Sequence, residues 1–424
     1  METRDRARKQ MKAVGITCGI GSMLVGARQA GFDIVGNVEW RKYYHEKDDR
    51  GRNTFKENFP GSHFIERMTD EEFEKFSNPD LALGHPECGN FSQLSGANAD
   101  KDARLLDPAD IPLFVDLVAR LRPKYFVMDD LPKSFMAFPM AEYAARLPDY
   151  DLYPEWISNW GYGNIQKSRN RMFMLGSLKS ERWAFRPGEF SHASTVHQAL
   201  EDLPAPMVGS NYPNHEPHEL DADAPRAGNM RGYGTKSTWR QVKEYFKDLP
   251  VGNMKYPTKD GRIVERIGFV KGHWDGSAHV LTGGNPTLHN IRCEPYTIRE
   301  RARIQGFPDD FVFYGTKLNS KGEWDHSKNL HMVKQTGKAM PVQFCRYVAA
   351  QMAARIKREP WICTDTRVIN PNKYIDEAKV WYCSKVGYEN QKAACSACWL
   401  RKRCPMTVVP ADARGEGIAR LVPR

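Results

Sequence analysis

The sequence has no apolar run of the roughly 18 residues that a membrane-spanning helix needs, so we predict that no segment crosses a membrane. The first twelve residues, METRDRARKQMK, are polar and basic and lack the apolar centre of a secretory signal. Both absences predict a cytoplasmic protein, associated with the nucleoid if its partner is DNA.

The sequence also lacks the even number of cysteines that a disulfide framework would need. The nine cysteines are an odd number in a chain without a signal, which argues against a disulfide framework. Four are scattered, whereas five lie between Cys363 and Cys404. The cysteines are therefore expected to act as thiols or metal ligands.

What the chain does have is positive charge. Its 424 residues carry a formal net charge of +10, with 41% hydrophobic and 27% charged residues. This composition is typical of a globular protein of two or three domains, and a basic surface suits a polyanion. The charge is compatible with a nucleic acid partner, DNA or RNA, although many basic proteins bind neither, and we expect a monomer.

The first 191 residues have the pattern of an α/β domain with a parallel sheet. Short β-branched runs at 13–17 and 33–40 enclose a glycine turn and a helical pattern. Further strands are predicted at 80–84, 124–130 and 171–176, with a helix at 110–121. We therefore expect residues 1–191 to form one α/β domain.

The pattern changes after Ser191. Residues 192–292 are rich in His, Asn, Gly and Pro and predict a smaller, loop-rich domain. Residues 293–358 return to the first domain, with a helix and turn at 296–311 and a long helix at 339–356. A cysteine-rich tail at 359–420 follows, and the last four residues, LVPR, read as the remainder of a thrombin site from a tag.

The glycine turn predicts a nucleoside site. Gly19 and Gly21 allow backbone to approach a ligand at a strand end, and the carboxylate of Glu39 after the next strand can bind ribose hydroxyls. Trp40 can cover an adenine ring. Leu24 stands where a dinucleotide fingerprint has its third glycine, so adenosine without a phosphate chain fits better than NAD.

Three further motifs carry chemistry. Cys88 in GHPECGNFSQLSG follows a strand, where it is either a buried structural thiol or a nucleophile. Asp129 and Asp130 end a strand, where they cap a turn or provide a general acid if one stays protonated. Arg169 and Arg171 are two positions apart, so on a strand both can reach one anion or base edge.

The tail has the cysteine spacing of a metal site. A Cys-x-x-Cys pair with two flanking cysteines in a chain without disulfides suits zinc or an iron–sulfur cluster, and free buried thiols are the alternative. Thiolates do not distinguish the two metals by sequence, and Cys363 is a further candidate. The predicted ligands are Cys383, Cys395, Cys398 and Cys404.

In this order the motifs resemble the DNA cytosine-5 methyltransferase family. TCGIGS resembles the family's glycine motif, GHPECGNFS its Pro-Cys loop and Asp129-Asp130-Leu131 its Glu-Asn-Val motif. KSRNR resembles the Gln-x-Arg-x-Arg motif, YTIRERARIQGFPDDF the late signature, and KQTGKAMPV the Gln-x-Gly-Asn motif. The resemblance covers residues 13–350, and it implies the S-adenosylmethionine-dependent (Rossmann-like) α/β fold. It also implies a catalytic, cofactor-binding domain at 1–191, a target recognition domain at 192–292 and double-stranded DNA as the partner.

The resemblance also implies a mechanism. A cytosine is flipped out of the helix, Cys88 attacks carbon 6, Asp129 protonates ring nitrogen 3, and Arg171 with Arg169 steadies the base. Carbon 5 then takes a methyl group from S-adenosylmethionine. The residues implied at the cofactor are Thr17, Cys18, Gly19, Ile20, Gly21, Glu39, Trp40, Glu66, Leu113, Lys338 and Ala339.

Several residues depart from the family pattern. Glu87 replaces a proline and is expected to raise the pKa of the neighbouring thiol unless a cation answers it. Asp129 is one methylene shorter than Glu, Thr17 replaces an aromatic, and Lys167 stands at the glutamine position. Such departures indicate an unusual lineage, with a phage as one source.

Because Lys338 stands in place of the family's asparagine, the identity of the group donor stays open. Its ammonium either pairs with Glu87, Asp130 or a DNA phosphate, or selects the carboxylate of carboxy-S-adenosylmethionine, which would make the product carboxymethylcytosine. Two other hypotheses stay open: a DNA-binding protein that has lost catalysis, and an RNA cytosine methyltransferase. The target sequence and the biological role are not readable from the chain.

Overall fold

The computed structural model divides the chain into two compact units, Met1–Ile369 and Asn370–Arg424. The structure describes residues 10–41, 46–66, 68–76, 78–91, 107–166, 169–183, 185, 195–217, 239–252, 255–257, 263–265, 270–283, 287–315, 326–357, 406–409 and 420–423. In these ranges no helix combines the length and the apolar character that crossing a membrane requires.

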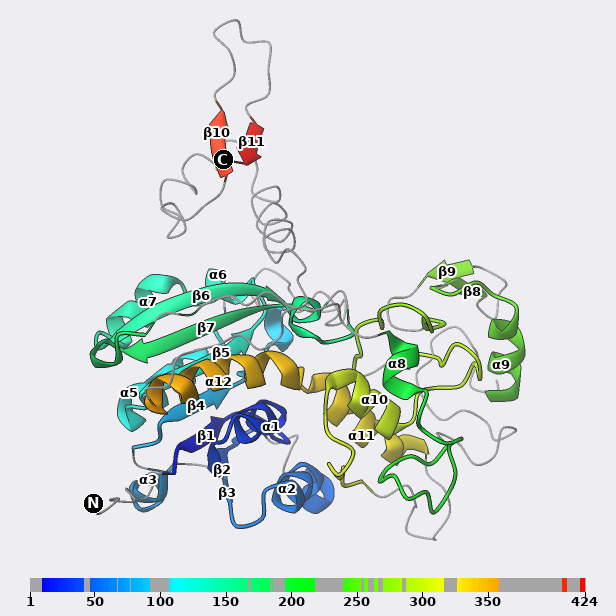
Figure 1. Cartoon of the computed structure of the whole chain (residues 1–424), viewed down its shortest axis with the longest axis horizontal. Coiled ribbons are helices and arrows are strands. Elements are labelled where there is room, and N and C mark those ends of the chain that lie inside the picture. Colours follow the sequence, from blue (N-terminus) through cyan, green and yellow to red (C-terminus); the bar gives the residue numbers. More distant parts are fainter. Residues whose placement is uncertain are drawn as a thin grey trace, which may run out of the picture. The chain divides into compact units, whose positions relative to one another are not determined.

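A seven-stranded sheet in the order β3-β2-β1-β4-β5-β7-β6 forms the centre of the first unit (Figure 1). The strands are β1 (Lys12–Ile16), β2 (Asp33–Val38), β3 (His63–Ile65), β4 (Leu81–Gly84), β5 (Tyr125–Asp130), β6 (Tyr150–Ser158) and β7 (Asn170–Leu178). The predicted α/β fold is confirmed. The expected parallel sheet is mixed, however, because β7 runs antiparallel to both β5 and β6.

The antiparallel edge has a simple cause. Only 159–169 join β6 to β7, and this connection is too short for the crossover that a parallel pair needs. Sequence patterns missed β6 and β3 because β6 lies at the edge of the sheet with mostly half-buried side chains, and β3 has three residues.

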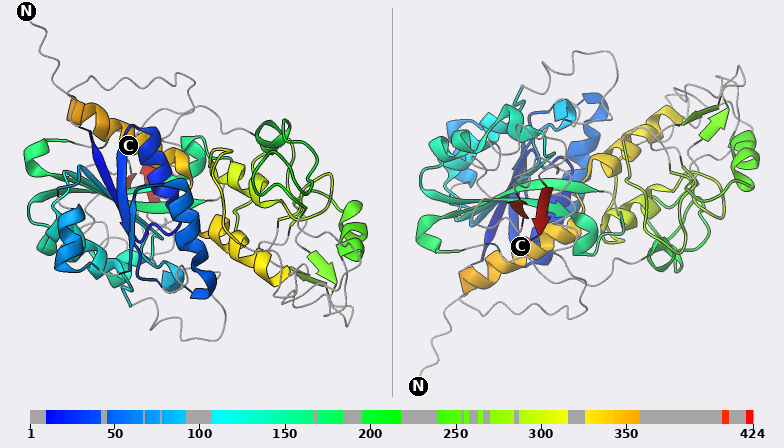
Figure 2. Two further views of the ribbon diagram at one scale, coloured as in Figure 1. Left: turned by 90° about the horizontal axis from the view of Figure 1, so that it is seen from below. Right: turned by 90° about the horizontal axis from the view of Figure 1, so that it is seen from above.

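The strands alternate their side chains between two apolar layers. Leu83 and Val127 point into one layer, with α1 (Ser22–Gln29), α2 (Glu46–Asn58) and α12 (Val342–Lys357). Ala82 and Met128 point into the other. That second layer is covered by α3 (Asp70–Phe76), α5 (Ile111–Leu121), α6 (Ser134–Ala137) and α7 (Met140–Arg146) (Figure 2).

The late helix α12 packs against α1 of the sheet domain. At Gly26 of α1 a Cβ atom would lie 2.6 Å from the backbone nitrogen of Arg346 in α12, so only glycine permits this approach. The helix begins at Val342 rather than 339, since residues 339–341 separate it from α11 (His326–Lys338).

The remaining elements of the first unit form a smaller lobe beside the sheet (Figure 1). Its elements are α8 (Val196–Leu200), α9 (Trp239–Lys247), β8 (Lys255–Pro257), β9 (Ile263–Glu265), α10 (Ile298–Gln305) and α11. Its small core joins Val196 and Leu281 to Ile304 of α10. Helix α10 begins with a capping box between Thr297 and Glu300, as its Thr-x-x-Glu sequence favours.

In the second unit β10 (Met406–Val409) pairs antiparallel with β11 (Arg420–Pro423), which includes residues of the LVPR segment. The cysteines at 383, 395, 398 and 404 lie outside the described residues, so the metal module stays a prediction. Within the described part no group of three or more His, Cys, Asp or Glu side chains is placed to hold a metal ion.

Candidate active site

The chemistry-bearing residues meet at one edge of the sheet. Strand β1 lies between β2 and β4, so the chain leaves it in both directions and a crevice opens at the carboxyl ends of the strands. Because β7 is antiparallel, its beginning lies at the end of β5. The residues at this edge are Thr17–Gly21 after β1, Glu39 after β2, His85–Cys88 after β4, Asp129–Asp130 of β5 and Arg171 of β7.

The turn after β1 has left-handed backbone at Thr17, Gly19 and Gly21. Two hydrogen bonds tie it to β2 and its extension: the Cys18 amide donates to Asn37 Oδ1 at 3.2 Å and the Gly19 amide to Glu39 Oε2 at 2.8 Å. The Cys18 thiol donates to a β4 carbonyl, and burial raises its pKa. Cys18 is therefore an inert thiol that shapes the turn.

Glu39 has a partner that the sequence did not indicate. Arg41 donates to both carboxylate oxygens, through Nε at 2.7 Å and Nη2 at 2.7 Å, and also to the carbonyls of Thr17 and His85. The indole nitrogen of Trp40 is buried with no hydrogen-bond partner among the described residues. The turn, the carboxylate and this free indole donor fit a nucleoside, provided that Arg41 releases part of Glu39.

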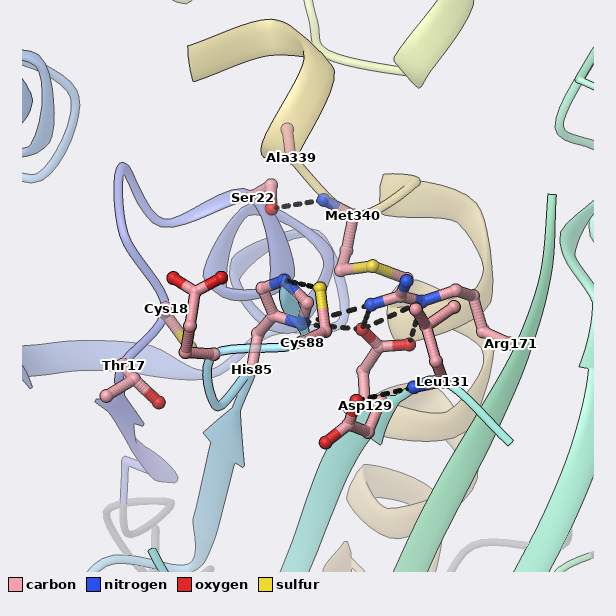
Figure 3. Close-up of polar contacts among 12 residues, drawn as sticks. Thr17, Cys18, Ser22, His85, Cys88, Asp129, Leu131, Arg171, Ala339 and Met340 are labelled. Carbon is pink, nitrogen blue, oxygen red and sulfur yellow. Dashed lines mark hydrogen bonds and ion pairs between the residues drawn. The ribbon is translucent and has the colours of Figure 1, made fainter. Parts of the chain in front are cut away.

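The carboxylate of Asp129 lies at the centre of the edge. Arg171 donates to it from Nε at 3.0 Å and from Nη2 at 2.6 Å, and His85 Nδ1 lies 2.7 Å from Oδ2 (Figure 3). Burial would raise the pKa of Asp129, but Arg171 and His85 hold it below its usual range. Asp129 is therefore ionised and orients two cations.

Cys88 is half-buried and faces His85, with 3.8 Å between Sγ and Nε2 (Figure 3). Burial would raise the pKa of the Cys88 thiol, but Arg171 and His85 lower it to about 6. Burial would lower the pKa of His85, but Cys88 and Asp129 raise it to about 9. At neutral pH the pair is thus a thiolate and an imidazolium.

Sequence reasoning missed His85. The signal was present, since a histidine three positions before a candidate nucleophile is a base within reach. The structure favours a reactive thiol at Cys88 over an inert buried one. It also agrees with the expectation for Glu87: this carboxylate raises the pKa of the thiol, and two cations outweigh its effect.

The two adjacent carboxylates differ in protonation. Burial raises the pKa of Asp130 well above its usual value, and the charge of Cys88 adds to this. Its Oδ1 accepts a hydrogen bond from the Leu131 amide, and its Oδ2 has no hydrogen-bond partner among the described residues. The expectation that one of the pair stays protonated thus applies to Asp130, whereas the ionised Asp129 had been expected to donate a proton.

Arg169 and Arg171 do not reach the same ligand in this structure. Arg169 lies before β7 and donates to the carbonyls of Leu281 at 3.1 Å and Ala339 at 2.5 Å. Burial, with the charge of Arg171, lowers the pKa of Arg169 to about 10. Arg169 therefore joins the smaller lobe to the sheet, and its guanidinium is held by backbone carbonyls.

Lys338, the last residue of α11, forms an ion pair with Glu87 at 3.6 Å between Nζ and Oε2, and each side chain is 40% exposed. This contact matches one of the alternatives given for Lys338. The next residues hold α11 near the glycine turn, because the Met340 amide donates to the Ser22 hydroxyl at 3.0 Å.

Three implied cofactor residues have different settings. Ile20 is buried in the turn, Glu66 is exposed directly after β3, and Leu113 is 45% exposed in the first turn of α5. Their contacts with a cofactor stay predictions.

The mixed α/β sheet has a glycine turn after β1, a carboxylate after β2 and a thiolate at the switch point. This is the arrangement of a methyltransferase fold that binds S-adenosylmethionine. The sequence profile of the C-5 cytosine-specific DNA methylases matches residues 11–354. The chain belongs to this family and is a methyltransferase.

Known proteins agree with this assignment. The chain is 26% identical over 361 residues to the type II methyltransferase M.HindV of Haemophilus influenzae, covering 82% of this chain and 98% of that protein. It is 26% identical over 418 residues to M.DdeI of Desulfomicrobium norvegicum, covering 85% and 91%. A crystal structure described as a prophage-encoded DNA modification methyltransferase (E. coli) shares the fold, with a TM-score of 0.59, 21% identity and coverage of 82% and 100%.

Proposed function

We propose that this protein flips a cytosine out of double-stranded DNA and transfers a methyl group from S-adenosylmethionine to carbon 5 through a covalent adduct with Cys88. The observation that carries the proposal is the thiol itself. Cys88 is half-buried at the switch point, and Arg171 and His85 lower its pKa to about 6, so the nucleophilic form dominates at neutral pH.

The other residues have roles that follow from their charge. S-adenosylmethionine, when bound, supplies the electrophilic methyl group. Glu39 and Trp40 would hold its ribose and adenine once Arg41 has moved. The ionised Asp129 would accept a hydrogen bond from the amino group of cytosine, and Arg171 would donate to the base oxygen.

The test is covalent trapping. DNA in which 5-fluorocytosine replaces cytosine cannot lose fluorine from carbon 5, so we expect an adduct with the wild-type protein and S-adenosylmethionine that resists denaturing electrophoresis. Cys88→Ala should give none. If the wild-type protein also gives none on DNA of varied sequence, while it still binds DNA, the proposal fails in favour of a binding protein that has lost catalysis.

The donor is the finer question. The ammonium of Lys338 already has a carboxylate partner in Glu87, and this favours methyl over carboxymethyl transfer. Nucleosides from DNA treated with both donors together should contain 5-methylcytosine as the only product, and DNA treated with carboxy-S-adenosylmethionine alone should contain neither product. Carboxymethylcytosine that is lost in Lys338→Asn would instead make Lys338 the donor-selecting residue. Unlabelled DNA and RNA competitors in the same assay decide between the two polymers.

The tail adds a separable proposal. We propose that the cysteines at 383, 395, 398 and 404 bind one zinc ion or an iron–sulfur cluster, on the basis of spacing alone. Elemental analysis of the anaerobically purified protein, with the double variant Cys395→Ser/Cys398→Ser as control, tests it. Equal metal content in the two proteins would overturn it.

A further inference from the structure

The imidazole of His85 lies between the reactive thiol and a buried carboxylate. Its Nε2 is 3.8 Å from Cys88 Sγ, and its Nδ1 is 2.7 Å from Asp129 Oδ2. The residue is 8% exposed, and its carbonyl accepts a hydrogen bond from Arg41 at 3.0 Å. Ring and backbone are therefore both held in place.

The tautomer follows from the partners. Arg171 Nη2 lies 3.3 Å from His85 Nδ1, but an arginine has only donors, so it does not accept a proton from the ring. Asp129 is ionised and accepts, which places one ring proton on Nδ1. This leaves Nε2, the nitrogen that faces the sulfur, as the site that gains or loses a proton.

The charges around the ring come from every element that surrounds it. Glu87 and Cys88 face it from its own loop, Asp129 and Asp130 from β5, Arg171 from β7 and Arg41 from the end of β2. Three of these groups are anions or become anions when the thiol ionises. An imidazolium at this position is therefore stabilised by negative charge on two sides.

We infer that His85 is the base that takes the thiol proton of Cys88, with Asp129 as the residue that orients and supports it. This inference rests on the proposed function and deepens it. The S–H bond breaks, its proton forms the Nε2–H bond, and the electron pair stays on sulfur. That pair forms the bond to carbon 6. Once carbon 5 carries the methyl group, its proton leaves to solvent, the electrons of that C–H bond re-form the 5,6 double bond, and the electrons of the carbon–sulfur bond return to sulfur. His85 keeps the thiol proton throughout.

The arrangement parallels the general one of a nucleophile, a base and a group that orients the base. It also explains how Cys88 tolerates Glu87: the imidazolium and Arg171 together offset the carboxylate beside the thiol.

The test measures the thiol without DNA or donor. The rate at which iodoacetamide alkylates Cys88 is followed by mass spectrometry of its peptide as a function of pH, because only the thiolate reacts. In the wild-type protein we expect the midpoint near pH 6. In His85→Gln and His85→Ala the midpoint should move upward and the rate at neutral pH should fall about tenfold, with the rate at high pH retained.

Two controls separate this role from a structural one. His63→Ala changes an exposed histidine on β3 and should leave the profile unchanged. Added imidazole should restore thiol reactivity and adduct formation in His85→Ala, because it supplies a base without restoring packing. Unchanged profiles in both His85 variants, with normal thermal unfolding, would overturn the inference. A shifted profile without methylation would uphold it and count against the proposed function alone.

Discussion

Two neighbouring clusters of buried charge use arginine in opposite ways. The sheet-edge cluster consists of Cys88, His85, Asp129 and Arg171, where charges face charges. The joint cluster consists of Arg169, Arg301, Gln166, Gln305 and Thr336, where the guanidinium groups donate to backbone carbonyls and a hydroxyl.

The difference appears in the arginine pKa values. Burial would lower the pKa of Arg171, but Asp129 and Cys88 raise it above its usual range. Burial lowers the pKa of Arg301 to about 9, and its partners are the Thr336 hydroxyl and the carbonyls of Thr282 and Val333. Buried arginine therefore tunes reactivity where it meets ionisable groups. Where it meets carbonyls it holds backbone segments together, within the smaller lobe for Arg301 and between that lobe and the sheet for Arg169.

The largest effect is expected from Arg171→Met. The variant leaves the Asp129 carboxylate buried with one of its two cations missing, which costs about 3–5 kcal/mol of stability. It should also raise the pKa of Cys88, because Arg171 is a leading cause of its lowering. Denaturant unfolding and the alkylation profile measure both effects. A wild-type alkylation profile in a folded variant would contradict the different roles of arginine in the two clusters.

Arg169→Met should destabilise the protein and change the thiol less than Arg171→Met does. Carbonyls of Leu281 and Ala339 lose their buried donor, at about 1–3 kcal/mol for each unsatisfied group. The midpoint of Cys88 alkylation should rise less than in Arg171→Met, because Arg169 is not among the leading causes of the lowered pKa of Cys88. If it moves as far as in Arg171→Met, the two clusters act as one.

The pH dependence of adduct formation should be bell-shaped. A Cys88 pKa lowered to about 6 means that the thiolate is lost as the pH falls through 6, and a His85 pKa raised to about 9 means that the imidazolium is lost above 9. Trapping on 5-fluorocytosine DNA should therefore be fastest between these values. A rate that only begins to rise near pH 9 would indicate an ordinary thiol.

The smallest effect is expected at the Glu87–Lys338 pair. Both side chains are 40% exposed, so breaking the pair should change stability by about 0–1 kcal/mol. Glu87→Gln should lower the pKa of Cys88 further, because the carboxylate raises it. A double-mutant cycle with Lys338→Asn measures the coupling. An upward shift of the thiol midpoint in Glu87→Gln would show that the carboxylate orders the loop instead.

Much of this protein was predictable from its sequence because local patterns report local structure. Alternation and glycine placement predicted β1, β2, β4, β5 and β7, and the order of motifs predicted the family. The edge strand β6 and the antiparallel direction of β7 were not predicted, because they depend on which strands pair across the sheet.

The candidate active site also has a part that the sequence predicted and a part that it did not. The sequence by itself predicted that Cys88 and the adjacent carboxylates would gather where parallel strands end, since strand ends share an edge. Arg171 lies at this edge because β7 is antiparallel, which the sequence did not predict. Only the tertiary structure decided their chemistry. Successive residues of a strand face opposite sides, so Asp129 meets Arg171 and His85 and stays ionised while Asp130 is buried and stays protonated. The partners that set these pKa values come from β4, β5 and β7, and spacing along the chain does not encode distances between strands.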